Sequence, residues 1–133
     1  MDARDFLAIA SEFRNSGKEA ERRTSIGRSY YGLFNSVIAT LESRGVLFHQ
    51  TAQDHYTLIS YLTKVRHKTA RSVGAILKDL RQHRNDADYN MVVVIDSKTT
   101  DFVYQKAAKA LGEFDSITLV DMQDIAEAIR SMP

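Results

Sequence analysis

The sequence predicts an all-α protein, an up-and-down bundle of five to six helices, from three observations. It contains one proline, Pro133, and six glycines, which are too few turn residues for many short strands. Apolar residues recur at steps of three and four over long stretches, the period of one helix face. The connections between these stretches are short, which favours helices packed side by side. We therefore expect residues 1–133 to form a single helical domain.

The first two helices carry the clearest apolar patterns. Residues 2–15 are expected to form the first helix, with Asp2 and Asp5 suited to the positive end of its dipole. Residues 18–44 are expected to form the longest helix, ended by Gly45. The apolar stripe of this long helix is Ile26, Tyr30, Leu33, Phe34, Val37, Ile38 and Leu41. Tyr30, Tyr31 and Phe34 are expected to be core residues, because an aromatic stripe at helical spacing usually packs in the interior.

The remaining chain divides into a loop, four helices and one apolar connection. Residues 46–53 read as a loop with exposed apolar residues. Helices are expected at about 54–64, 69–90, 97 or 99–114, and 121–131. Residues 91–95, MVVVI, have strand propensity but no partner strand, so we expect an extended linker packed on the bundle.

The segment Leu80–Met91 combines an apolar stripe with charged side chains. Arg84 stands between Leu80 and Ala87, where the helical period predicts an apolar residue. Asp88 follows on the same side of the helix, and Asn85 and Tyr89 form a second pair four residues apart. One interpretation is a local ion pair that stabilises the helix by about 0.3 kcal/mol. The other is a binding site, and spacing alone does not separate the two.

Composition limits the class of protein and the compartment. The chain has no cysteine, which removes disulfides and zinc–thiolate sites, and no His or carboxylate spacing indicates a metal site. It has no apolar run long enough to cross a membrane and no signal-peptide pattern, so we expect a cytoplasmic protein. Residues 64–84 carry seven basic residues and one acidic residue, a charge of +6, whereas residues 85–133 carry −5. This asymmetry is typical of a polyanion site or of an ordinary solvated surface.

Two motifs resemble the HEPN superfamily, in the branch with SYYxxF and RxxADY signatures. The first is Ser29-Tyr30-Tyr31-Gly32-Leu33-Phe34 in the long helix, and the second is Arg84-Asn85-Asp86-Ala87-Asp88-Tyr89. A histidine opening the next helix, His55, also fits. The similarity extends from about residue 18 to residue 111 and implies a four-to-six-helix bundle that usually dimerises.

The resemblance also implies a site. Nuclease members of the superfamily cleave RNA without metal, using an Arg, commonly followed by Asn or Asp, and a His five residues after the Arg. Arg84 and Asn85 match, but Tyr89 occupies the histidine position, and a phenol with a pKa of about 10 is a poor base at neutral pH. We therefore expect binding of RNA or a nucleotide, without a cofactor; the alternative is a metal-independent endoribonuclease that uses Arg84. The expected binding residues are Arg28, Lys78, Arg81, Arg84, Asn85, Asp88 and Tyr89.

The remaining expectations concern the other histidines and the partners of the protein. His83 points about 100° away from Arg84, and His55 is expected to be a structural residue off the Arg84 surface, with a site role as the alternative. Gly27 and Gly32 within the long helix indicate close approach of a neighbour, either within the chain or in a second subunit. From the resemblance we expect a homodimer in a prokaryotic toxin–antitoxin or defence system. A minimal nucleotidyltransferase that modifies a tyrosine near the motif is a possible partner.

Overall fold

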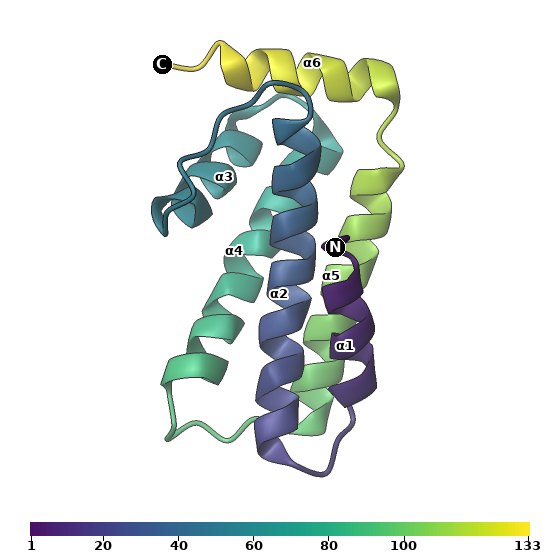
Figure 1. Cartoon of the computed structure of the whole chain (residues 1–133), viewed down its shortest axis with the longest axis vertical. Helices are drawn as coiled ribbons and strands as arrows, with labels where there is room; N and C mark the ends of the chain where they lie inside the picture. The colour runs from purple at the N-terminus through teal and green to yellow at the C-terminus, as the bar shows by residue number, and fades with distance from the viewer.

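The computed structural model describes all 133 residues and contains six helices and no strand (Figure 1). The helices are α1 (Asp5–Phe13), α2 (Glu19–Glu42), α3 (Gln53–Lys64), α4 (Lys68–Tyr89), α5 (Ser97–Asp115) and α6 (Leu119–Arg130). The predicted all-α bundle is therefore confirmed. Helix α1 begins later than expected because Asp5 and Phe6 donate to carbonyls only three residues back, a tighter turn than an α-helix.

Helix α2 is the centre of the bundle and packs against α1, α4 and α5, while α3 packs on α4 (Figure 1). The chain runs up α2, turns through α3 and returns down α4, so α2 and α4 are antiparallel neighbours. Helix α6 crosses one end of the bundle. This arrangement sets the middle of α2, with the Ser29–Phe34 motif, beside the second half of α4, with the Arg84–Tyr89 motif.

The core is one continuous apolar cluster to which all helices except α1 contribute large side chains. Tyr30, Leu33, Leu77 and Leu80 are fully buried, and Phe34 is nearly so, which confirms Tyr30 and Phe34 as core residues. Tyr31 is only partly buried and packs against the edge of the core. Burial of such side chains contributes roughly 1.5–3 kcal/mol each. No helix is both long and apolar enough to cross a membrane.

Close packing at the α2 glycines occurs within the chain. A Cβ at Gly32 would lie 2.9 Å from Leu7 Cγ and 3.4 Å from the Leu7 backbone nitrogen, so α1 needs a glycine there. At Gly27 the nearest atom to a Cβ is Asp88 Oδ1 at 3.7 Å, an ordinary contact. The neighbour that requires a glycine at position 32 is therefore α1 of the same chain, and the contacts of neither glycine require a second subunit.

The connection between α4 and α5 differs from the expected packed linker. Only Ile95 is buried; residues 91–94 are exposed, with Val92 at 91% and Val94 at 75%. The connection is held by its backbone, because Arg22 Nε donates to Ile95 O at 2.8 Å and the Arg23 guanidinium donates to Val93 O. Arg23 also donates to three carbonyls at the end of α4, where a cation is favoured by the helix dipole; these are Asp86 O, Ala87 O and Asn90 O, at 2.9–3.2 Å.

Candidate functional site

Arg84 lies where the apolar stripe of α4 meets α2, and its side chain is only 16% exposed. Leu80 before it and Ala87 after it are buried, so the helical period has placed the guanidinium at the edge of the core. Its Nε lies 2.9 Å from Asp88 Oδ2, one turn along α4. The Arg84–Asp88 ion pair, one of the two interpretations of this segment, is therefore present.

The hydrogen bonds of the Arg84 guanidinium are few and long. Nη1 donates to Asn85 Oδ1 at 3.2 Å and Nη2 to the Tyr89 hydroxyl at 3.3 Å. The Nε atom is close to the Asp88 carboxylate, but its N–H is poorly aligned with the oxygen and makes no hydrogen bond. Since a guanidinium has five N–H donors, Arg84 retains capacity for an oxygen-rich ligand.

Two tyrosine rings flank this guanidinium. The Arg84 Cζ atom lies 5.2 Å from the ring centroid of Tyr31, on α2, and 5.3 Å from that of Tyr89, distances at which a cation is attracted to an aromatic ring. Tyr31 is partly buried, whereas Tyr89 is 70% exposed. An exposed ring beside a cation is the combination that binds a base and its phosphate.

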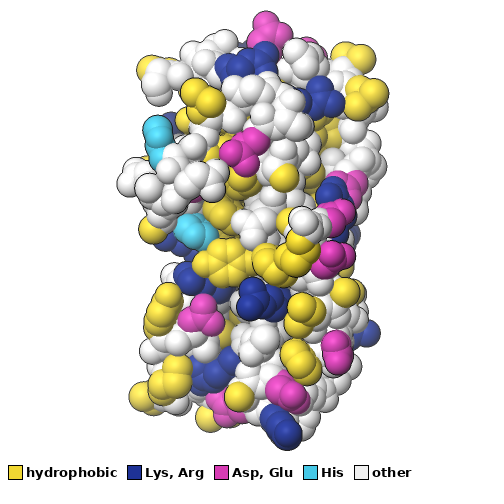
Figure 2. Space-filling model, viewed as in Figure 1, with side chains coloured by type: hydrophobic (Ala, Val, Ile, Leu, Met, Phe, Trp, Pro, Cys, Tyr) yellow, Lys and Arg dark blue, Asp and Glu magenta, His cyan; other side chains and the backbone are white.

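Arg28 and Asp88 extend the site across α2. They line a cleft of about 230 Å³ together with Thr24, Gly27 and Tyr31. The Arg28 guanidinium lies 5.0 Å from the Phe6 ring centroid and makes no ion pair. Basic side chains flank a hydrophobic band at mid-height on this face of the molecule, with a histidine beside it (Figure 2).

Arg81 and His55 form the other side of the site. Arg81 is partly exposed and makes no hydrogen bond or ion pair, and Lys78 is exposed one turn earlier on α4. His55, on α3, stacks on Phe34 with ring centroids 4.3 Å apart, and its Nδ1 lies 2.6 Å from the Tyr30 hydroxyl. Burial lowers the pKa of His55, and the positive charges of Arg81 and Arg84 lower it further.

The position of His55 corrects the expectation that it lies off the Arg84 surface. It contacts Tyr31 edge-on, at 5.8 Å between centroids, and Tyr31 in turn contacts Arg84. Spacing along the chain could not reveal this, because the contact depends on how α3 packs beside α2 and α4. The structure brings the predicted residues together on one face: Arg28, Arg81, Arg84, Asn85, Asp88 and Tyr89.

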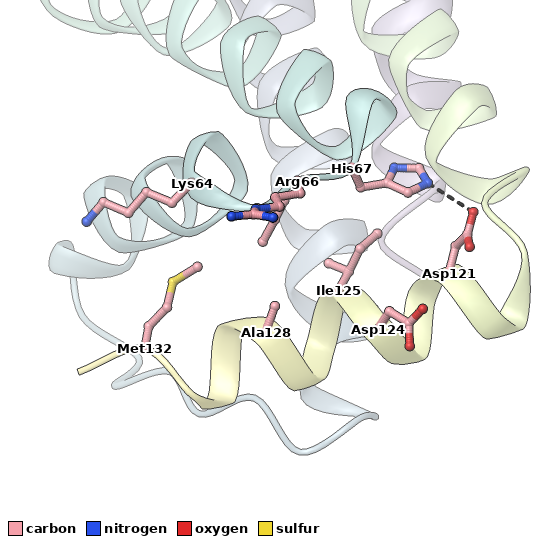
Figure 3. A pocket seen from close by; sticks show the side chains of 9 residues that line it. Lys64, Arg66, His67, Asp121, Asp124, Ile125, Ala128 and Met132 are labelled. Carbon is pink, nitrogen blue, oxygen red and sulfur yellow. Dashed lines mark hydrogen bonds and ion pairs between the residues drawn. The ribbon is translucent and has the colours of Figure 1, made fainter.

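A second, larger cleft of about 490 Å³ lies between the α3–α4 connection and α6 (Figure 3). Lys64 and Arg66 line one wall and Asp124 the other. His67 Nδ1 accepts the Ala70 N–H and so caps α4, while Nε2 lies 3.2 Å from Asp121 Oδ2. Arg84 comes 17 residues after His67, so the two clefts are roughly 25 Å apart along α4. Sequence patterns do not indicate this cleft, because its walls come from separate segments.

Comparison with models of protein families, with curated proteins and with solved structures gave no match. The class of the protein is thus defined by its six-helix all-α bundle, with a cationic and aromatic site between α2, α3 and α4. The HEPN resemblance stays a prediction from two motifs. No three His, Asp or Glu side chains gather as metal ligands.

Proposed function

We propose that the face formed by α2, α4 and the start of α3 binds phosphate groups of RNA or of a nucleotide. The observation that carries this proposal is Arg84: a guanidinium only 16% exposed, with incompletely used donors, between an exposed and a partly buried tyrosine ring. A planar guanidinium binds two phosphate oxygens at once, and a partly buried one is screened less by salt. Arg28 and Arg81 add two further charges without ion-pair partners.

Tyr89 supports a nucleotide rather than a simple anion. Its ring is 70% exposed and its hydroxyl accepts from Arg84 Nη2. A base stacked on an exposed aromatic ring contributes about 1–3 kcal/mol, largely without regard to sequence. A ligand with both a phosphate and a base would therefore contact Arg84 and Tyr89 together.

Asp88 limits the affinity that we expect for phosphate at this site. Its carboxylate lies beside Arg84 Nε and repels an incoming phosphate, so the ion pair must loosen as the ligand binds. The side chain of Asp88 is 37% exposed, so water can solvate the released carboxylate. We expect modest affinity for mononucleotides and stronger, salt-dependent affinity for single-stranded RNA, which contacts several cations.

The test compares two arginines of α4. Arg84→Ala is expected to weaken RNA binding, measured by fluorescence anisotropy, and to lower the slope of log affinity against log salt by about one. Arg71→Ala, an exposed position at the other end of α4, is the matched control and should leave affinity nearly unchanged. If both variants bind RNA like the wild type while Arg84→Ala alone melts at a lower temperature, Arg84 is structural and the proposal is wrong.

RNA cleavage is the second candidate function, and the observation that favours it is that His55 and Arg84 both contact the Tyr31 ring. Its base would come from α3, because Tyr89 occupies the motif position expected for histidine. Cleavage of RNA by the wild type in EDTA, lost in a folded Arg84→Ala variant, would establish it. Binding without cleavage supports the first function.

The proposal includes the toxin–antitoxin or defence setting and the homodimer that the resemblance implies. The exposed Tyr89 hydroxyl is accessible for nucleotidyl transfer from a partner enzyme of a toxin–antitoxin system. A homodimer would cover exposed apolar side chains in residues 91–94, next to the site. Light scattering at micromolar concentration tests this, since a mass of twice 15.1 kDa is expected and a mass near 15.1 kDa would contradict it.

A further inference from the structure

The hydrogen bond between Tyr30 and His55 determines which ring nitrogen of His55 carries the proton. Tyr30 is fully buried, and its hydroxyl has one partner, His55 Nδ1, at 2.6 Å. Burial raises the pKa of Tyr30 well above its ordinary value, so the phenol keeps its proton. If Nδ1 were the donor, the Tyr30 O–H would be buried without an acceptor, at a cost of about 1–3 kcal/mol. The Tyr30 hydroxyl therefore donates and Nδ1 accepts.

The proton of the neutral imidazole must then be on Nε2. This atom makes no hydrogen bond within the protein, yet it is not among the buried side-chain atoms that lack a partner, which are Ser29 Oγ and Arg84 Nε. It therefore reaches solvent. His55 is thus an N–H donor with an open side. Its ring contacts Tyr31, which also contacts the Arg84 guanidinium, and the positive charges of Arg81 and Arg84 both lower the pKa of His55.

We propose that His55 Nε2–H is a third donor of the site, which binds a phosphate oxygen together with Arg81 and Arg84, and that Tyr30 is the positioning residue. This inference rests on the proposed function and makes it more specific. Donors from His55, Arg81 and Arg84 favour an acceptor-only oxyanion, the phosphate ester of a nucleotide, over an uncharged nucleoside, and the Asp88 carboxylate beside Arg84 Nε has to loosen as this oxyanion binds. An Nε2 that already carries a proton is not a general base, so the same hydrogen bond favours binding over RNA cleavage.

The other charged groups near His55 are consistent with this assignment. Asp54, its neighbour in α3, accepts the backbone N–H groups of His49 and Gln50 at 3.0 and 2.8 Å and so holds the loop before α3. From α2, the Tyr30 hydroxyl and the Tyr31 ring contact the imidazole. The charge of Asp54 raises the pKa of His55, whereas the charges of Arg81 and Arg84 on α4 lower it. The Asp54 carboxylate is bonded to the two backbone N–H groups and makes no hydrogen bond to His55 Nε2.

The protonation state is measured first, without any ligand. Long-range ¹H–¹⁵N correlation spectra of the whole protein at pH 7.5 should show His55 with Nε2 protonated and Nδ1 unprotonated, assigned by the signal lost in His55→Gln. In Tyr30→Phe, the Nδ1 resonance should move toward that of a nitrogen without a hydrogen bond. An Nδ1–H tautomer in the wild type, or a His55 resonance unchanged in a folded Tyr30→Phe variant, would overturn the proposal.

The binding role is then tested with adenosine 5′-monophosphate and adenosine. His55→Ala should weaken monophosphate binding about tenfold, as expected for one hydrogen bond to a charged group, and adenosine should bind poorly to both proteins. His83→Ala, a partly exposed histidine next to Arg84, is the matched control and should keep wild-type affinity. If binding depends on Arg84 but not on His55, only the present inference fails. If the wild type binds neither RNA nor the monophosphate, the proposed function fails with it.

Discussion

Substituting alanine at the two glycines inside α2 should have opposite effects on stability. Both positions are in the interior of the helix, where alanine is favoured over glycine by about 1 kcal/mol. They differ in what the new Cβ meets. At Gly27 it meets Asp88 Oδ1 at 3.7 Å, whereas at Gly32 it would lie 2.9 Å from Leu7 Cγ and 3.1 Å from Cδ2.

The magnitudes follow from these distances. Gly27→Ala should raise the free energy of unfolding by up to about 1 kcal/mol. Overpacking at Gly32 costs about 1–3 kcal/mol, so after the helix-propensity gain Gly32→Ala should be destabilised by about 0–2 kcal/mol. The Leu7 backbone nitrogen would lie 3.4 Å from the new Cβ, which is the near limit of an ordinary contact, so the clash is with the Leu7 side chain. A change of the Leu7 rotamer or a small shift of α1 would relieve it, at a cost in packing.

Urea denaturation of both variants and of Leu7→Ala measures the difference. Leu7→Ala removes the clashing Cγ and Cδ2 atoms, so the Gly32→Ala/Leu7→Ala double variant should be more stable than the sum of the single effects predicts. The close approach of α1 would be refuted if Gly27→Ala and Gly32→Ala changed stability equally and if the effects of Gly32→Ala and Leu7→Ala simply added in the double variant. A Gly32→Ala variant of unchanged stability but half the wild-type mass would instead place Gly32 in a subunit interface.

Two further predictions concern His55 and Arg23. Burial lowers the pKa of His55, so the folded state binds a proton at this residue less readily than the unfolded state. The free energy of unfolding, measured by urea denaturation, should therefore fall as the pH drops below about 6.5. In His55→Gln this fall should be less steep. A slope unchanged in that variant would contradict the pKa shift. Arg23→Ala removes donors to carbonyls of α4 and residues 90–93, so it should cost about 2 kcal/mol or more and speed amide exchange there. Exchange at the wild-type rate would show that Arg23 does not hold the connection.

Helical periodicity predicted the bundle because its core is formed by regular stripes. The stripe around Tyr30 in α2 and the stripe around Leu80 in α4 set the elements, their facing sides and their adjacency. Arg84 was identifiable because a charged residue occupied an apolar position in one of those stripes. Arg23 is also a charged residue at an apolar position of a stripe, because Ile26 and Tyr30 follow it at steps of three and four. Its side chain is likewise largely buried, at 13% exposure.

The contacts of His55 and the exposure of residues 91–94 could not be predicted in the same way. A histidine at a helix start has many uses, and only the packing of α3 beside α2 brings His55 to Tyr30. The run MVVVI is apolar throughout, so its pattern does not distinguish packed from exposed residues. Backbone hydrogen bonds from Arg22 and Arg23, rather than burial of its side chains, hold that connection in place.

The most direct test of the central claim locates the bound ligand. ¹H–¹⁵N spectra of the protein titrated with adenosine 5′-monophosphate should change at Arg81, Arg84, Asn85 and Tyr89 and at the His55 ring, with saturation at one common affinity. The cleft below α6, with Lys64 and Arg66, offers the competing location. Changes confined to that cleft, or the absence of any saturable change, would contradict the assignment of the phosphate site to the α2–α4 face.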